Sequence, residues 1–111
     1  FLNKISKAHI SFFKHLKLFH TIGEYLFVHA GINPEKDLSK QDKMDFLWSR
    51  SDEFFDKNFK FEKIIVHGHT PEEEVVSYPY RINVDTGCFF SGKLSCVCVN
   101  DHDKKREFIY S

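Results

Sequence analysis

The sequence of 111 residues predicts an α/β fold in which a mixed sheet is flanked by helices. Two short apolar runs, at residues 25–29 and 63–66, are separated by segments with helical spacing, which is the order of a strand, a helical crossover and a second strand. The last third contains short β-branched or aromatic runs divided by turn residues, as expected for antiparallel hairpins. These observations indicate one α/β domain or part of one.

Residues 3–20 are predicted to form an amphipathic helix, because apolar side chains recur there every three or four positions with lysines between them. Residues 25–29 follow as a strand, and their continuous apolar character indicates burial on both faces. Because the sequence begins with Phe1 in place of methionine, directly in the predicted helix, we expect the chain to be one piece of a longer protein.

Two helical segments are predicted between the two strands. Ser39, followed three residues later by Asp42, has the spacing of a capping box and is expected to open a helix that ends near residues 49–50. A second segment, at residues 52–57, begins an aromatic cluster that continues to the strand at residues 63–66. These rings are expected to pack in the core against the sheet.

The last third is predicted to contain strands without helices, at residues 75–76, 81–84, 93–99 and 107–110, with turns at residues 91–92 and 100–105. Cys96 and Cys98 lie within one of these strands and are expected to be small buried apolar residues. Three cysteines without a C-x-x-C spacing indicate neither a disulfide framework nor a zinc ribbon. A reduced, cytoplasmic environment is therefore expected.

Composition argues against several kinds of partner. With 41% hydrophobic and 29% charged residues, the sequence is typical of a globular protein and not of a disordered or fibrous one. Lysine plus arginine and aspartate plus glutamate number 16 each, so the formal net charge is zero and neither nucleic acid nor a membrane is an expected partner. No stretch approaches the run of about 20 apolar residues that a membrane span requires.

A histidine stands at the end of each of the two apolar runs: His29 is the last residue of the first, and His69 lies three residues after the second. They are 69 − 29 = 40 residues apart, enough for a strand, a crossover and a strand to place them side by side as ligands of one divalent ion. In an extended segment His67 would face the same way as His69. A histidine on an apolar strand is more often a hydrogen-bonded structural residue, so spacing alone leaves both interpretations open.

Four segments in order, YLFVHAGINP, DFLWSR, IIVHGHTP and RINVDTGCFFSGKLSCV, resemble the C-terminal half of the calcineurin-like metallophosphoesterases of the serine/threonine protein phosphatase type, especially bacterial and phage members. The resemblance covers nearly the whole chain, so residues 1–111 are expected to be the C-terminal part of one such domain. It implies an incomplete fold, the C-terminal half of the metallophosphoesterase β-sandwich.

The resemblance implies metal-dependent hydrolysis of a phosphate ester, with two divalent ions, manganese, iron or zinc, in the intact enzyme. It implies that His29 and His69 are ligands of the second ion and that Arg50 binds the substrate phosphate, a role that suits a planar guanidinium. The triplet at residues 85–87 is implied to lie near the active site in a mainly structural role. His67 is implied to be a neighbour of the site and not a ligand.

The implied substrate is a phosphorylated protein, and a dinucleoside polyphosphate is the alternative because related tetraphosphatases share similar motifs. The Asp-x-His, GDxxDRG and GNH motifs of the family's first half do not occur in this sequence. The catalytic set is therefore incomplete, and the chain alone is expected to bind at most one metal ion weakly and to be inactive.

The missing half, supplied in trans, is one expected partner, and an exposed apolar surface is expected where it would dock. Two other interpretations remain. One is a non-catalytic interaction module, and the other, less favoured, is a mononuclear Cys/His metal protein.

Overall fold

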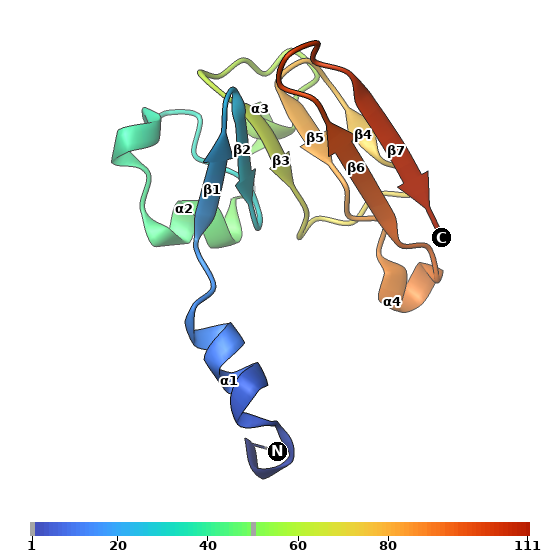
Figure 1. Ribbon diagram of the computed structural model, residues 1–111. Helices are drawn as coiled ribbons and strands as arrows, with labels where there is room; N and C mark the ends of the chain where they lie inside the picture. The colour runs from blue at the N-terminus through green and yellow to red at the C-terminus, as the bar shows by residue number, and fades with distance from the viewer. Residues whose placement is uncertain (1, 50) are drawn as a thin grey trace.

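The computed structural model describes residues 2–49 and 51–111 and contains two sheets (Figure 1). A five-stranded sheet has the order β1-β2-β3-β5-β4, and a two-stranded sheet pairs β6 with β7. The strands are β1 (Phe19–Ile22), β2 (Tyr25–Val28), β3 (Ile64–His67), β4 (Val76–Ser77), β5 (Arg81–Asn83), β6 (Ser95–Val99) and β7 (Arg106–Tyr110). The helices are α1 (Lys7–Lys14), α2 (Lys43–Trp48), α3 (Asp52–Phe55) and α4 (Cys88–Ser91), with 3₁₀ turns at Leu2–Lys4 and Leu38–Lys40. The predicted α/β fold is confirmed, and its mixed sheet is consistent with a partial metallophosphoesterase fold.

Three neighbouring strands of the larger sheet, β2, β3 and β5, run parallel. Tyr25 pairs with Ile64, and Ile65 pairs with Arg81. The outer strands β1 and β4 are antiparallel to their neighbours. Every residue of β3 is buried, as the continuous apolar sequence predicts for a central strand. Parallel pairing brings the carboxyl ends of β2, β3 and β5 to the same edge of the sheet.

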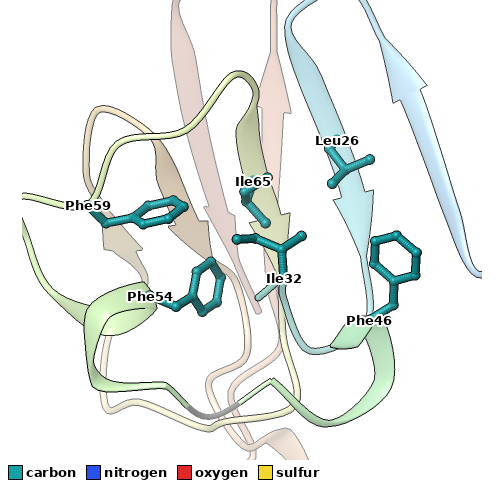
Figure 2. Packing of buried hydrophobic residues seen from close by; sticks show 6 residues of the cluster. All are labelled: Leu26, Ile32, Phe46, Phe54, Phe59 and Ile65. Atoms are coloured by element: carbon teal, nitrogen blue, oxygen red, sulfur yellow. The ribbon is translucent and has the colours of Figure 1, made fainter. Parts of the chain in front are cut away.

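Alternate strand residues face two apolar clusters on opposite sides of this sheet. One cluster joins the strands to α2 and α3 and is shown in Figure 2; its buried members are Leu26, Ile32, Phe46, Phe54, Phe59 and Ile65. The other contains Tyr25, Ile64, Val66 and Ile82, with Val97, Val99 and Phe108 of β6 and β7 packed against it. The small helices therefore cover one face of the sheet, and the β6–β7 hairpin covers the other.

The predicted helix at residues 3–20 is confirmed at α1 and wrong beyond it. Residues Phe19–Ile22 form the edge strand β1, in which Phe19 pairs with Val28 and Ile22 with Tyr25. Gly23, with φ +55°, lies in the two-residue connection between β1 and β2. A tight turn followed by an apolar strand favours hairpin pairing over the helical spacing of the preceding residues.

Apolar side chains of the N-terminal segment are exposed, and docking of the missing half on this surface remains a prediction. Helix α1 has no buried residue, and Figure 1 shows it standing away from the sheets. Phe12 and Phe13 are 63% and 59% exposed, and Ile22 at the sheet edge is 54% exposed.

The expectation that Cys96 and Cys98 are buried is wrong. Both lie on β6 and are exposed, and Cys88 of α4 is exposed as well. The strand alternates, so that Val97 and Val99 face the apolar cluster while the two cysteines face away from it. A two-stranded sheet that covers the core on one face leaves its other face open. The prediction of strands alone is also wrong at α4, which spans Cys88–Ser91, while Gly92 of the predicted turn ends this helix with φ +74°.

Helix α2 begins three residues later than the sequence predicts. Ser39 lies in the 3₁₀ turn, while Asp42 and Asp45 form the capping box: Asp42 Oδ1 accepts from Asp45 N at 3.1 Å, and Asp45 Oδ2 accepts from Asp42 N at 2.9 Å. Lys36 Nζ contacts both carboxylates at 3.1 and 2.8 Å, which favours this arrangement.

Two serine substitutions test whether Ser39 caps a helix, as the sequence predicts, or makes no cap, as the structure shows. Ser51 Oγ accepts from Phe54 N at 3.1 Å at the start of α3, so Ser51→Ala is expected to lower the free energy of unfolding by about 1 kcal/mol. Ser39 makes no such cap, and Ser39→Ala is expected to leave it unchanged. Urea unfolding followed by circular dichroism measures both changes. A larger loss of unfolding free energy for Ser39→Ala than for Ser51→Ala would support the capping box at Ser39 that the sequence predicts.

No helix within residues 2–49 and 51–111 is long and apolar enough to cross a membrane.

Candidate functional site

Polar residues follow each of the three parallel strands at the edge where their carboxyl ends meet. His29 follows β2, His69 lies two residues beyond β3, and Asp85 lies two residues beyond β5. All three line a cavity of about 490 Å³ at this edge. The carboxyl edge of a parallel sheet is the usual position of a ligand site in α/β proteins, because loops there converge from several strands.

The structure brings His29 and His69 together, as their spacing and the parallel crossover predict. The distance from His29 Nε2 to His69 Nδ1 is 3.1 Å, and the ring centroids are 4.7 Å apart. At this distance one nitrogen donates a hydrogen bond to the other. The juxtaposition is confirmed, and the role of the two residues as metal ligands remains a prediction.

His69 has an unusual backbone conformation. Its φ of +71° lies in the left-handed region, which residues other than glycine seldom adopt. Thr70 N donates to Gly68 O at 2.9 Å, closing a three-residue turn with His69 at its centre. This combination describes a γ-turn of the rare, strained type. Strain of this kind is typical of functional sites, where the surrounding structure holds one side chain in place.

Hydrogen bonds from both neighbouring strands hold this turn. Gly68 N donates to His29 O at 2.9 Å, which joins the ends of β2 and β3. On the other side Asn83 Nδ2 donates to Thr70 O at 2.7 Å, and Val84 N donates to His67 O at 2.9 Å. Asn83 is fully buried, so its amide is fixed by packing as well. The His69 turn is therefore clamped between the loops that follow β2 and β5.

His67 and His69 make different contacts, although both line the cavity. The left-handed turn at His69 ends the extended conformation, and His67 remains in β3 with 2% exposure. Arg81 Nη1 lies 3.2 Å from His67 Nε2, and His67 Nδ1 lies 3.0 Å from Gly68 O. The arginine must donate, so Nε2 accepts and Nδ1–H donates to Gly68 O.

This arrangement keeps His67 neutral. The pKa of His67 is lowered from 6.5 to about 4, mainly by burial and also by the positive charge of Arg81, against the opposing effects of the Gly68 carbonyl and Asp85. Arg81 is itself 2% exposed, and its guanidinium lies over the rings of Phe54 and Phe55 at 5.5 and 5.0 Å. A neutral, buried His67 is a structural support below the site.

The triplet at residues 85–87 shapes the loop after β5. Asp85 Oδ1 accepts from Gly87 N at 2.9 Å, and Asp85 N donates to Asn83 Oδ1 at 3.0 Å. Thr86 Oγ1 donates to Lys93 O at 2.7 Å. These bonds fix the entry to α4 and hold the Asp85 carboxylate at the rim of the cavity.

Two imidazoles at this separation fit the first two ligands of one divalent ion. His29 Nε2 and His69 Nδ1 are 3.1 Å apart, close enough that both could ligate one divalent ion, and neutral imidazole nitrogen is a good ligand for such ions. In the part of the chain that the structure describes, no group of three or more His, Cys, Asp or Glu side chains is placed to hold a metal. The histidine pair thus fits a metal as part of a larger ligand set.

Arg50, the predicted phosphate-binding residue, lies outside the described residues. Sequence reasoning missed Trp48, which is 55% exposed and meets the His69 ring edge to face, with centroids 5.2 Å apart and an interplanar angle of 88°. The signal for it was present in the sequence, since Trp48 is the single tryptophan and belongs to the same motif as Arg50.

Comparison with protein-family models gave no match. Among curated proteins, the chain is similar to asymmetrical bis(5′-nucleosyl)-tetraphosphatases named PrpE. The protein of Bacillus cereus strain AH187 is 31% identical over 111 aligned residues, which take in 84% of this chain and 44% of the relative. That of Anoxybacillus flavithermus is 39% identical over 41 residues, or 37% of this chain and 17% of the relative. The chain therefore spans less than half the length of the curated relatives it matches, and over most of its own length it is similar to part of a tetraphosphatase.

Proposed function

We propose that this chain is the part of a metal-dependent phosphoesterase that supplies two imidazole ligands, and that the substrate is a dinucleoside polyphosphate. The observation that carries the proposal is the 3.1 Å separation of His29 Nε2 and His69 Nδ1 at the carboxyl ends of adjacent parallel strands. The strained turn at His69 supports it, because the fold stabilises an unfavourable backbone conformation at this residue.

The comparisons favour a nucleotide over a phosphorylated protein. The relatives are named as tetraphosphatases of dinucleosides, which supports the alternative substrate class from the sequence more closely than the phosphoprotein one. The four motifs are common to phosphoprotein phosphatases and dinucleoside tetraphosphatases. The motifs supply the metal and phosphate chemistry that both reactions share, so they do not separate the two substrates.

His29 and His69 would hold a divalent ion, manganese, iron or zinc, together with ligands from outside this chain. Such an ion supplies a Lewis acid and a hydroxide nucleophile for phosphoester hydrolysis. The chain's own contribution is positional: the hydrogen bonds of Gly68 and Asn83 fix the two imidazoles before binding. One of the two facing nitrogens carries a hydrogen, which must move to the other nitrogen of the same ring when both histidines become ligands, so binding would require a change of tautomer.

Arg50 is proposed to bind the phosphate of the substrate, as the resemblance of the segment DFLWSR implies. Two neutral imidazoles provide no negative charge to offset desolvation of a divalent ion. We therefore propose that the remaining ligands come from another segment, in the same polypeptide or in trans, and that this chain alone binds metal weakly and does not turn over substrate.

Zinc titration of the chain tests the ligand assignment. Each of His29→Ala and His69→Ala is expected to weaken zinc binding by about tenfold or more, because half of the imidazole pair is lost. His102→Ala, at an exposed turn position between β6 and β7, is the matched control and is expected to bind as the unmodified chain does. Isothermal titration calorimetry at a fixed pH measures these affinities.

Equal zinc affinity in the unmodified chain and both site variants would rule out the ligand assignment. If instead the site variants lose zinc binding and no phosphoester is cleaved when the chain is joined to a segment carrying the missing motifs, the metal site would stand and the interaction module would be favoured over the enzyme.

A further inference from the structure

We propose that Trp48 stacks against a nucleobase and that the cavity beside α2 holds the nucleoside, so that Trp48 determines specificity for a nucleotide over other phosphate esters. This inference rests on the proposed function, because it assigns the substrate's base to a position next to the histidine pair. A phosphorylated peptide is the competing occupant that the test excludes.

The position of Trp48 carries the first step. It is the last residue of α2, it is 55% exposed, and its ring meets His69 with centroids 5.2 Å apart. One part of the indole therefore touches a residue of the proposed metal site, and much of the remainder is open to solvent. A base stacked on Trp48 would therefore lie next to His69 of the proposed metal site.

The scaffold under Trp48 is firmly held. Phe46 of α2 is 4% exposed, and its carbonyl accepts from Ala30 N at 2.8 Å, next to His29. Ser49, after the helix, donates from Oγ to Ile32 O at 2.5 Å. Both ends of the Trp48 segment are thus bonded to the loop that carries His29. A large aromatic side chain on a fixed support binds flat ligands at a low cost in conformational entropy.

The second step is a cavity of about 310 Å³ that Trp48 helps to line. Its lining combines the indole with amide, hydroxyl and carboxylate side chains, among them Asn33, Ser51 and Glu53. Amide and carboxylate groups pair with the amino groups and ring nitrogens of bases, and carboxylates accept hydrogen bonds from ribose hydroxyls. An aromatic face beside such groups suits a nucleoside.

Charge decides which part of the substrate enters this cavity. Among the described residues that line it, Glu35 and Glu53 are negatively charged and Asp45 is paired with Lys36 at 2.8 Å, so a phosphate there would meet like charges from the two glutamates. A neutral base with its ribose carries no such penalty. The phosphates are left to the histidine pair, and Trp48 contacts both parts of the site.

The chain provides its own reporter, because Trp48 is the single tryptophan in the sequence. Titration with adenosine, which has no phosphate, is expected to quench its fluorescence saturably, while ribose 5-phosphate, which has no base, is expected to leave it unchanged. Diadenosine tetraphosphate is expected to quench at lower concentrations than adenosine. Binding of adenosine or diadenosine tetraphosphate without a change in the tryptophan emission would contradict stacking on Trp48.

Variants measured by equilibrium dialysis with labelled adenosine complete the test. Loss of one stacked base corresponds to about a 5- to 150-fold weaker affinity, so Trp48→Ala is expected to fall in that range and Trp48→Phe to retain most of the binding. Phe89→Ala is the matched control, since Phe89 is an exposed aromatic residue on α4, 92% exposed, and is expected to have no effect.

The two proposals fail in different ways. Adenosine binding that is unchanged in Trp48→Ala overturns the base site and leaves the metal assignment untouched. Zinc binding that is unchanged in His69→Ala overturns the proposed function, even where adenosine binding depends on Trp48. A phosphoserine peptide that quenches Trp48 while adenosine does not would reject the nucleoside and favour the peptide.

Discussion

Phe54→Ala is expected to lower the free energy of unfolding by about 3–5 kcal/mol, the largest stability effect of any single substitution proposed for this chain. Phe54 is fully buried, and its ring contacts those of Phe55, Phe59 and His67 with centroids 5.2, 5.1 and 4.9 Å apart. The guanidinium of Arg81 lies 5.5 Å from the same ring. Truncation leaves a cavity and also removes the aromatic cover of a buried cation.

Urea unfolding at neutral pH measures this loss. Phe89→Ala provides the control, because Phe89 is 92% exposed and its loss is expected to change the free energy of unfolding by less than about 0.5 kcal/mol. Equal effects of the two substitutions would show that the cluster around Phe54 is not the stabilising core. Phe54→Leu, which retains much of the volume, is expected to recover part of the loss.

Phe54 also explains a feature that the sequence shows without its cause. The residues after His29 are small, which predicts a tight exit from β2 but gives no reason for glycine at position 31. Gly31 has φ +140°, and a Cβ there would lie 2.3 Å from Cε2 of Phe54. The glycine is needed because a ring 23 positions later fills the space beside it. Sequence spacing does not reveal such a contact.

Sequence predicted best where the signal is local and continuous. The buried runs gave the parallel strands β2 and β3, and their separation gave the juxtaposition of His29 and His69. Prediction failed where pairing or coverage decides the outcome. The spacing before residue 20 predicts a helix, but the residues of β1 pair with β2 in a hairpin. Cys96 is exposed because its strand covers the core with only one face.

The candidate site shows the same division. Its two histidines were predicted from strand ends and from the resemblance, whereas the strained turn at His69 depends on hydrogen bonds from Asn83 and the end of β2. His67 is held apart from the pair of His29 and His69 by its contact with Arg81. This arginine lies 14 residues later in the sequence, on the neighbouring strand β5. Roles set by contacts between strands required the three-dimensional arrangement.

The pH dependence of stability is the second large effect and follows from His67. In the folded chain burial lowers its pKa to about 4, with Arg81 acting in the same direction and the Gly68 carbonyl and Asp85 opposing it. In the unfolded chain the imidazole titrates near its ordinary value of 6.5. Between these values the unfolded state binds the additional proton, so stability is fully present above about pH 6.5 and is lost as the pH falls toward 4.

The interval from 6.5 to about 4 corresponds to about 3 kcal/mol at 1.36 kcal/mol per pH unit. Urea unfolding at about pH 7 and about pH 4 is expected to show this loss in the unmodified chain. His67→Gln keeps an acceptor for Arg81 but does not titrate, so the variant is expected to lose much less stability over the same range. Parallel pH profiles for the two proteins would mean that other groups cause the acid sensitivity, and that the buried pair of His67 and Arg81 does not couple proton binding to the unfolding of the sheet beneath the site.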